Sequence, residues 1–311
     1  MMEREAIVAK IALLTGLEPR KRIHLRFLAN YWALTKPDVN FLIAIAVFVS
    51  FCLARLTTLQ SFPYTLLIHT LLGTLLIASG TGALNQVIER RFDSQMRRTS
   101  RRPLVAKSIS PVRALWFGIF LSLAGAAYLA LAVNALSSLI AVLTLVSYLA
   151  IYTPLKRETP LCTLVGVFPG ATPPLIGWAA ASGNLSLESW LLYSILFLWQ
   201  FPHFMAIAWM YRHDYNRAGY QVLPQRENMH RFVAFQSFIP ALLLVPISLI
   251  PALLGEEGRI YFVGATLLGL TFLYCAARLA FNRSNIVARQ LLLASIIYLP
   301  SVFLLMLLDR T

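Results

Sequence analysis

The apolar sequence LLIHTLLGTLLIASGTGAL at residues 66–84 runs directly into the polar and basic sequence NQVIERRFDSQMRRTSRRPL at residues 85–104. The first part has the length of a membrane-spanning helix, which needs about 20 apolar residues. The second part concentrates acidic, amide and arginine side chains where that helix would leave the bilayer. Together they predict a membrane protein with a chemical site at one surface of the bilayer.

Three oxygen-bearing side chains recur every fourth residue in the polar part: Asn85, Glu89 and Asp93. If the helix continues through them, successive members are turned only ~40° from one another and share one face. Clustered carboxylates repel each other and therefore need a cation. So few hard oxygen ligands suit Mg²⁺, with phosphate oxygens completing its shell. The spacing predicts a metal site at the end of a membrane helix.

A group of arginines adjoins this oxygen-bearing face: Arg90, Arg91, Arg97, Arg98, Arg101 and Arg102. Arginine is well suited to binding an anion such as a diphosphate. For the arginines alone, the favoured interpretation is a solvated loop whose charges fix the topology. Joined to the acidic face, they favour a metal–diphosphate site.

The composition indicates a polytopic membrane protein. Hydrophobic residues make up 58% of the chain and charged residues 13%, and the mean hydropathy is +0.69; a soluble globular domain needs less apolar sequence. The formal net charge is +14, but the basic residues lie in short gaps between apolar runs. They therefore indicate topology and contact with anionic headgroups of the lipid bilayer, not nucleic-acid binding. The isolated cysteines predict neither a disulfide framework nor a zinc site.

The apolar runs predict an all-α protein of about nine transmembrane helices around a central cavity, with eight as the alternative because the fourth run is short. With the N-terminus inside, nine spans place all 27 Lys and Arg residues on the inside except Arg55, Arg259 and Arg310. The positive-inside rule then places the loops rich in polar residues in the cytoplasm. We divide the chain into a cytoplasmic N-terminal segment, residues 1–38, and one transmembrane domain, residues 39–311. The runs are 41–56, 64–86, 114–134, 136–153, 161–182, 189–211, 232–254, 260–281 and 289–308.

Two further polar segments fall on the same predicted side. They are YTPLKRETP at residues 152–160 and WQFPHFMAIAWMYRHDYNRAGYQVLP at residues 199–224, the second a weak echo of the first motif that fits a bundle of two related halves. Lys156 and Arg157 in the first segment add cations for an anion. Asp214 in the second is a further candidate metal ligand; the alternative is an exposed ion pair with Arg212 or Arg217.

The fifth apolar run carries three prolines and three glycines: Pro169, Pro173, Pro174, Gly166, Gly170 and Gly177. These residues predict a bent or broken helix, which is tolerated in a membrane where it lines a cavity. A packing kink is the alternative. Close packing of neighbouring backbones is also expected beside Gly80 and Gly82.

Diphosphate on a carbon chain is a leaving group, and a departing diphosphate is stabilised by Mg²⁺ and by basic side chains. The carbocation left behind needs a dry cavity with aromatic walls, for which the candidates are Trp199, Phe201, Phe204, Trp209, Tyr211 and Tyr215. His203 lies roughly 12 Å along its helix from Tyr211 at ~1.5 Å per residue. A polar group at that depth is a functional candidate; the alternative is a hydrogen bond between helices.

On these motifs the chain resembles the UbiA-type intramembrane prenyltransferase superfamily, and within it the subfamily of protoheme IX farnesyltransferases. The resemblance extends from about residue 30 to the C-terminus. It rests on the first motif and on YTPLKR at 152–157, WQFPHF at 199–204, YRHDY at 211–215 and Ala218-Gly219. Glu89 stands where bacterial members commonly have aspartate. The second acidic motif of quinone and chlorophyll relatives is lacking, and Asp214 is its sole counterpart.

The resemblance implies transfer of a farnesyl group from farnesyl diphosphate to a vinyl group of heme B, with addition of water, to give heme O and diphosphate. Mg²⁺ would be held by Asn85, Glu89, Asp93 and Asp214. The diphosphate would be bound by a set of basic residues: Arg98, Arg102, Lys156, Arg157 and Arg212. Heme B would contact His203, as an axial ligand or through orientation of the ring, and would also contact Trp199, Phe204, Tyr211 and Tyr215.

The resemblance also implies the bacterial cytoplasmic (inner) membrane as the location. It leaves open the oligomeric state and a partner such as a heme-A-forming enzyme. Two other functions compete with this one: a membrane prenyltransferase for an aromatic or quinone precursor, and a transporter with an ion site at a broken helix. A transporter is expected to place its ionisable residues near the middle of the membrane, whereas the acids of this chain cluster at one interface.

Overall fold

The computed structural model describes residues 19–56, 61–224 and 227–310, and this part of the chain is helical. The predicted N-terminal segment therefore lies partly outside the described residues, and the division at residue 38 stays a prediction. The elements are α2 (Pro19–Leu34), α3 (Pro37–Leu56), α4 (Tyr64–Asp93), α5 (Pro111–Ala132), α6 (Ala135–Val146), the π-helical η1 (Ser147–Tyr152), α7 (Thr153–Leu155), α8 (Cys162–Gly170), α9 (Pro173–Ser182), α10 (Leu187–Met210), α11 (Arg212–Arg217), α12 (Glu227–Leu253), α13 (Arg259–Phe281) and α14 (Asn285–Leu308).

Within the described residues, nine helical segments are long and apolar enough to cross a membrane. This confirms the predicted fold class and favours nine spans over eight. The uncertain fourth span is α6, η1 and α7 in succession, Ala135–Leu155. The second span is longer than its apolar run because α4 continues to Asp93, as the spacing of the oxygen-bearing residues required.

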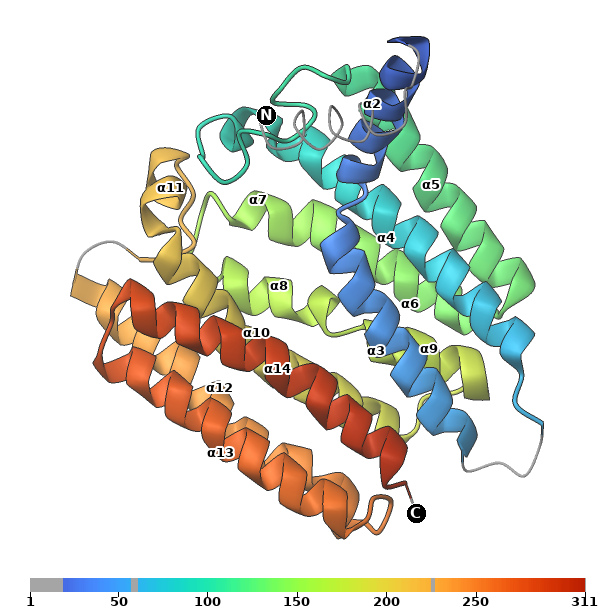
Figure 1. Cartoon of the computed structure of the whole chain (residues 1–311), viewed down its shortest axis with the longest axis vertical. Coiled ribbons are helices and arrows are strands. Elements are labelled where there is room, and N and C mark those ends of the chain that lie inside the picture. Colours follow the sequence, from blue (N-terminus) through green and yellow to red (C-terminus); the bar gives the residue numbers. More distant parts are fainter. Residues whose placement is uncertain (1–18, 57–60, 225–226, 311) are drawn as a thin grey trace.

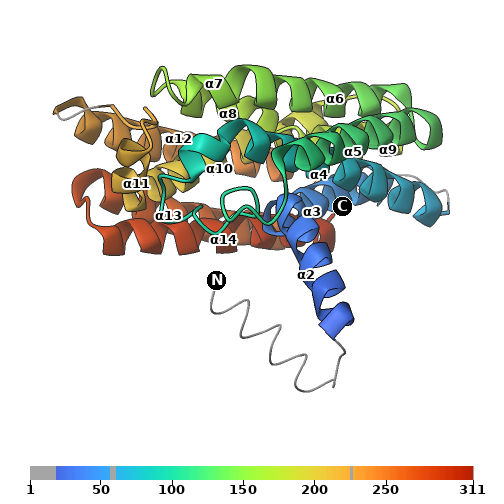
Figure 2. The ribbon, with the colours of Figure 1, turned by 90° about the horizontal axis from the view of Figure 1, so that it is seen from above.

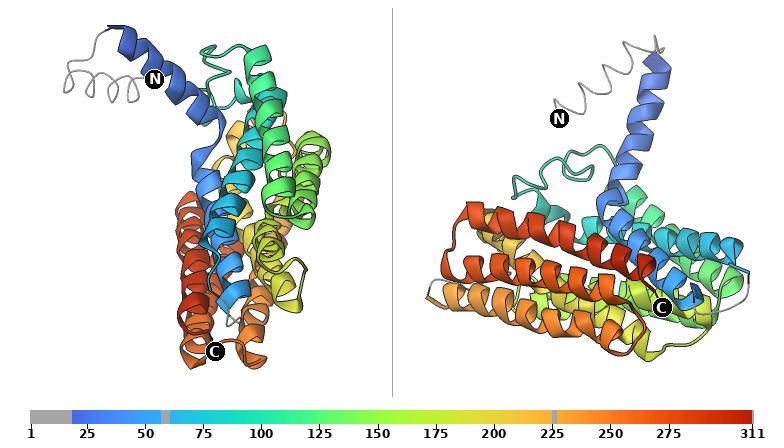
Figure 3. Two further views of the ribbon diagram at one scale, coloured as in Figure 1. Left: turned by 90° about the vertical axis from the view of Figure 1, so that its right-hand side faces the viewer. Right: turned by 60° about the horizontal axis from the view of Figure 1, so that its bottom comes forward.

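The spans lie side by side with their polar connections gathered at one end of the bundle. Figure 1 shows the loop after α4, α11 and the α13–α14 turn at one end, and the C-terminus with the α12–α13 turn at the opposite end. Figure 2 shows α2 projecting away from the spans, and Figure 3 places it at the end that carries the loop after α4. We call this end, with the loop at residues 94–110 and α11, the polar end.

Glycines bring α4 and α5 into close contact next to the polar end. A Cβ on Gly80 would lie 2.7 Å from the Gly118 carbonyl oxygen and 2.6 Å from the Ser122 amide nitrogen. Both of those contacts are with backbone of α5, which cannot swing aside as a side chain would. The predicted backbone packing at Gly80 is confirmed, and it fixes the helix that carries the oxygen-bearing residues.

The fifth span is broken, as its prolines predicted. α8 ends at Gly170, α9 begins at Pro173, and Ala171 and Thr172 form the break. Thr172 Oγ1 accepts from or donates to Thr144 Oγ1 at 2.7 Å, which ties the break to α6. Gly170, Thr172 and Pro173 line the main cavity, so the break lies at a cavity wall and is more than a packing kink.

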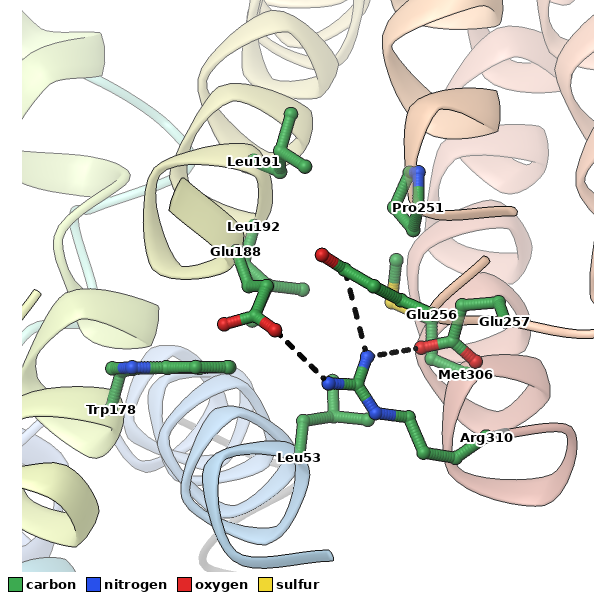
Figure 4. Close-up of a pocket in the computed structure, with 10 residues that line it drawn as sticks. All are labelled: Leu53, Trp178, Glu188, Leu191, Leu192, Pro251, Glu256, Glu257, Met306 and Arg310. Carbon is green, nitrogen blue, oxygen red and sulfur yellow. Dashed lines mark hydrogen bonds and ion pairs between the residues drawn. The ribbon is translucent and has the colours of Figure 1, made fainter. Parts of the chain in front are cut away.

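An arginine near the C-terminus holds the opposite end of the bundle together. The Arg310 guanidinium lies 3.0 Å from Glu257, 3.4 Å from Glu188 and 3.7 Å from Glu256, and Figure 4 shows it between these three carboxylates. Burial raises the pKa of Glu257 to about 7 from its usual 4.5. One guanidinium therefore joins the end of the chain to α10 and to the α12–α13 turn.

Replacing Arg310 by alanine is expected to lower the free energy of unfolding by on the order of 3 kcal/mol, because it leaves buried carboxylates without their cation. The raised pKa of Glu257 means that the folded state keeps a proton between about pH 4.5 and 7 that the unfolded state has lost. Without the guanidinium, which lowers that pKa, Glu257 would hold its proton to still higher pH, so the deficit of Arg310→Ala should shrink as the pH falls from 8 toward 7. Thermal unfolding in detergent measures it, with exposed Arg259→Ala as the control; a deficit independent of pH would contradict this assignment.

The side of the membrane that each end faces remains a prediction from the charge pattern. In a chain with its three native cysteines replaced, a single cysteine at Ser94 is expected to react with an impermeant maleimide from the cytoplasmic side. One at Gly183, after α9, is expected to react from the outside. The two positions lie at opposite ends of the bundle; labelling of both from one side of sealed vesicles would end the nine-span topology.

Candidate functional site

The oxygen-bearing side chains of α4 are buried and share one face, and each is bound by a basic side chain from elsewhere in the chain. Asn85, Glu89 and Asp93 are 0%, 5% and 1% exposed. The helix positions them because it continues uninterrupted through Asp93. Their partners are Lys36, Lys156 and Arg102. The structure thus brings the predicted oxygen face together with two of the predicted cations and one that was not predicted.

Lys36 is the basic residue that sequence reasoning missed. Its Nζ donates to Asn85 Oδ1 at 2.6 Å, and Asn85 Nδ2 donates to Thr153 Oγ1 at 3.2 Å, so the orientation of the amide is fixed from both sides. Burial, assisted by the positive charge of Arg102, lowers the pKa of Lys36 to about 7. The sequence does show a Lys-Pro pair before the first span, but a lysine at that position is equally expected from the positive-inside rule alone.

Lys156 is paired with Glu89. Its Nζ lies 2.7 Å from Glu89 Oε1 and 4.4 Å from the centroid of the Tyr152 ring. Burial disfavours the charged ammonium, but the Glu89 carboxylate outweighs it and holds the pKa of Lys156 well above its usual value. Lys156 therefore stays a cation at every physiological pH.

Asp93 is held by Arg102 at the boundary of the bundle. Arg102 Nη1 donates to Asp93 Oδ2 at 2.5 Å and lies 3.9 Å from Glu89 Oε2. The other oxygen, Asp93 Oδ1, is buried without a hydrogen-bond partner in the described part of the chain. An unpartnered carboxylate oxygen on the same helix face as a second carboxylate and an amide oxygen fits a divalent cation.

This donor set is small. Among residues 19–56, 61–224 and 227–310, no group of three His, Cys, Asp or Glu side chains is placed to hold a metal ion. Two carboxylates and one amide leave about half of the positions of an octahedral Mg²⁺ shell to other oxygens, such as those of a phosphate. The residues present fit a magnesium ion that arrives with a diphosphate.

Asp214 lies outside this group. Its carboxylate accepts from the Arg98 backbone N–H at 3.3 Å and pairs with Arg217 at 3.6 Å, and it does not line the cavity. Arg98 also donates to the Tyr215 hydroxyl at 3.2 Å. Asp214 thus joins α11 to the loop at residues 94–110, and the ion pair with Arg217 that was the alternative is present, although the carboxylate is buried and not exposed. Its role as a metal ligand stays a prediction.

A cavity of about 450 Å³ opens between the spans from this polar group toward the centre of the membrane. Six predicted residues of the metal and diphosphate end line it: Asn85, Glu89, Asp93, Arg98, Arg102 and Lys156. Four predicted residues of the heme-contact set also line it: Trp199, His203, Phe204 and Tyr215. Further lining residues that the sequence did not single out include Lys36, Tyr148, Gln200 and Tyr220.

Besides Asp214, three residues predicted to bind the diphosphate or heme do not line the cavity. The Arg157 guanidinium lies over the Phe92 ring at 4.9 Å. Arg212 donates to the Trp209 carbonyl oxygen and to Asn285 Oδ1. The Tyr211 ring lies beneath the Arg98 guanidinium at 5.2 Å. Each is at the polar end, but its side chain is occupied by contacts between helices and loops.

Beside the cavity, α10 packs against α14. His203 Nδ1 lies 2.8 Å from Ser295 Oγ, so the predicted hydrogen bond between helices exists. The Trp199 ring stacks on the His203 ring with centroids 4.7 Å apart and an interplanar angle of 24°. His203 nevertheless lines the cavity, so it can contact a ligand there while it keeps this hydrogen bond.

The fold and the site define an intramembrane transferase of the kind that acts on diphosphate esters: a helical bundle with an oxygen face and basic side chains at one end and an aromatic pocket deeper in. The chain belongs to the UbiA prenyltransferase family, whose model matches residues 41–302.

Curated relatives and solved structures agree with this assignment. The chain is 50% identical over 287 residues to the protoheme IX farnesyltransferase of Solibacter usitatus, covering 90% of this chain and 98% of that protein. It is 44% identical to the protoheme IX farnesyltransferase of Koribacter versatilis over 91% of this chain and 94% of the relative. A UbiA homolog from Archaeoglobus fulgidus bound to GPP and Mg²⁺ shares the fold at a TM-score of 0.62 and 14% identity, over 89% of this chain and 99% of that one. The structure of a digeranylgeranylglyceryl phosphate synthase shares the fold at a TM-score of 0.74 and 16% identity. The alignment covers 91% of this chain and 98% of that one.

Proposed function

We propose that this chain transfers a farnesyl group from farnesyl diphosphate to a vinyl group of heme B, with addition of water, giving heme O and diphosphate. The observation that carries the proposal is a single cavity with an oxygen face and cations at its polar end and a histidine among aromatic rings at its deep end. The similarity to protoheme IX farnesyltransferases over nine-tenths of the chain supports the same reaction.

The polar end provides the site for the leaving group. Asn85 Oδ1, Glu89 and Asp93 would hold Mg²⁺, and the homolog bound to GPP and Mg²⁺ supports this choice of metal for the family. When bound, the ion would neutralise charge that develops on the departing diphosphate. Asp214 is an additional candidate ligand only if the loop at residues 94–110 releases its backbone contact.

The basic side chains bind and orient the diphosphate. Lys36 and Lys156 each contact one residue of the oxygen face, Arg102 contacts two, and Arg98 lines the same end of the cavity. The positive charge of Lys156, Arg98 and Arg102 attracts the diphosphate and stabilises it as the C1–O bond of the farnesyl chain breaks, and Lys36 contributes in its protonated form. Arg157 and Arg212 act from further away, through the packing of the loops that carry the site.

The acceptor occupies the deep end. The vinyl electron pair of heme B forms the new bond to farnesyl C1, and water adds to the cation left on the porphyrin side chain and releases a proton. His203 would bind the heme iron, since a neutral imidazole is a common axial ligand, with Trp199 and Phe204 beside the ring. Tyr215 lines the cavity near the diphosphate end, while Tyr211 would reach heme only by leaving Arg98.

The location that fits this reaction is the bacterial cytoplasmic membrane, with the polar end in the cytoplasm. Farnesyl diphosphate is charged and would enter from that side, and both substrates have apolar parts that the bilayer can deliver. A heme-A-forming enzyme would then be the partner that takes heme O as its substrate in the next reaction. Relatives from bacteria support this setting.

Purified protein in liposomes tests the proposal. With Mg²⁺, farnesyl diphosphate and heme B, we expect release of one diphosphate for each heme converted to a hydroxyethylfarnesyl product, identified by mass. Parallel reactions receive 4-hydroxybenzoate or a quinone precursor in place of heme B. Prenylation of either compound with heme B left unchanged would assign the acceptor to the alternative class.

A further inference from the structure

Ser295 of α14 makes three contacts, and two of them are with rings that line the cavity. Its carbonyl oxygen accepts from Trp199 Nε1 at 2.9 Å. Its hydroxyl lies 2.8 Å from His203 Nδ1 and donates to the Leu292 carbonyl oxygen at 2.6 Å. Ser295 is fully buried, so water does not compete for these bonds. One residue therefore contacts both of the rings that stack on each other in α10.

The pattern of these bonds fixes which nitrogen of His203 carries the proton. A serine hydroxyl has one hydrogen, and in Ser295 it is used by the Leu292 carbonyl oxygen. The Ser295 oxygen must then accept from His203 Nδ1. A charged ring at this membrane depth would be costly, so the imidazole is neutral, Nδ1 holds its one proton, and Nε2 holds a lone pair.

The plane of the imidazole is fixed as well as its tautomer. The Trp199 ring covers one face of His203 at 4.7 Å, and the Trp199 indole is itself held by the Ser295 carbonyl oxygen. The Nδ1 edge of His203 faces Ser295, and His203 lines the cavity. The Nε2 edge is accordingly the one left for a ligand in the cavity.

We propose that Ser295 is a positioning residue of the acceptor site, which holds His203 in the tautomer whose Nε2 lone pair binds the iron of heme B. The inference rests on the proposed function, in which heme B is the acceptor. A hydrogen bond from the second nitrogen of a ligating histidine orients the ring and tunes the bond to the metal. Ser295 fulfils this part from a different helix, so that the packing of α14 against α10 determines the geometry of the heme.

Heme B titrated into purified Ser295→Ala protein tests the inference, with affinity and absorption spectrum as readouts. Loss of such a partner typically lowers metal affinity roughly 10- to 100-fold, so we expect weaker heme binding by that factor and a shifted Soret band. Farnesyl diphosphate affinity should not change. Ser295→Thr, which keeps the hydroxyl, should restore both heme readouts.

Ser237→Ala is the matched control. Ser237 on α12 is, like Ser295, fully buried without itself lining the cavity, and it donates to the carbonyl oxygen four residues earlier, Val233. Its removal should leave heme affinity and spectrum unchanged. If Ser295→Ala is recovered unfolded, Ser295→Cys replaces it, since a thiol keeps the volume and is a weak acceptor; the same loss is expected.

The outcomes separate this inference from the function on which it rests. Wild-type heme affinity and spectrum in folded Ser295→Ala or Ser295→Cys, with heme binding lost in His203→Ala, would overturn the positioning role and leave the heme site in place. An unchanged heme spectrum in His203→Ala would instead overturn the acceptor site itself.

Discussion

Asp93→Ala is expected to reduce the rate of prenyl transfer by on the order of 10²–10³, the usual effect of losing one contact that stabilises developing charge. Asp93 offers the site a buried carboxylate oxygen that has no partner in the described residues. Alanine removes that oxygen and also frees Arg102, whose guanidinium lies 2.5 Å from the carboxylate. The measurement is diphosphate release per folded protein at saturating heme B.

Two comparisons make this result interpretable. Glu158→Ala removes an exposed carboxylate that does not line the cavity and should retain full activity. Asn85→Ala, one further member of the oxygen face, should lose activity as Asp93→Ala does. Full activity in Asp93→Ala at an unchanged melting temperature would show that this face is not the metal site.

Lys156→Met is expected to fail in two separable ways. It leaves the buried Glu89 carboxylate without the ammonium that lies 2.7 Å away, which should cost about 3–5 kcal/mol of stability. It also removes a cation from the diphosphate site, which should reduce kcat/KM by on the order of 10²-fold. Melting temperature and steady-state kinetics in the same detergent measure the two losses.

The double variant Lys156→Met with Glu89→Gln separates these effects. Neutralising both partners removes the unpaired buried charge, so most of the lost stability should return. Activity should stay low, since the cation and the negative charge of a metal-binding carboxylate are both gone. Lys107→Met, an exposed lysine that does not line the cavity, is the matched control. Recovery of activity along with stability would show that Lys156 serves the fold alone.

Features with a local cause were predictable from the sequence. The length of the apolar runs predicted the membrane-spanning helices. The spacing of four residues predicted that Asn85, Glu89 and Asp93 share one face, because the helix rotates 100° per residue. The break between α8 and α9 followed from prolines that cannot donate a backbone hydrogen bond. These outcomes depend on a few neighbouring residues only.

Features that depend on contacts between distant segments were not predictable. Lys36 meets Asn85 across 49 residues of sequence, and its motif resembles any basic residue before a span. Lys156 and Arg157 are adjacent in the turn that follows α7, yet only Lys156 lines the cavity. Ser295 has no distinguishing sequence context, and its role becomes visible only where α14 meets α10.

Pigment analysis of membranes tests the central claim most directly. A bacterial strain without its own heme O synthase receives this chain, and hemes extracted from its membranes are separated and weighed by mass spectrometry. We predict that heme O appears with the intact chain and is absent with Asp93→Ala at an equal protein level. Heme B alone in membranes that contain the intact, folded protein would contradict the account.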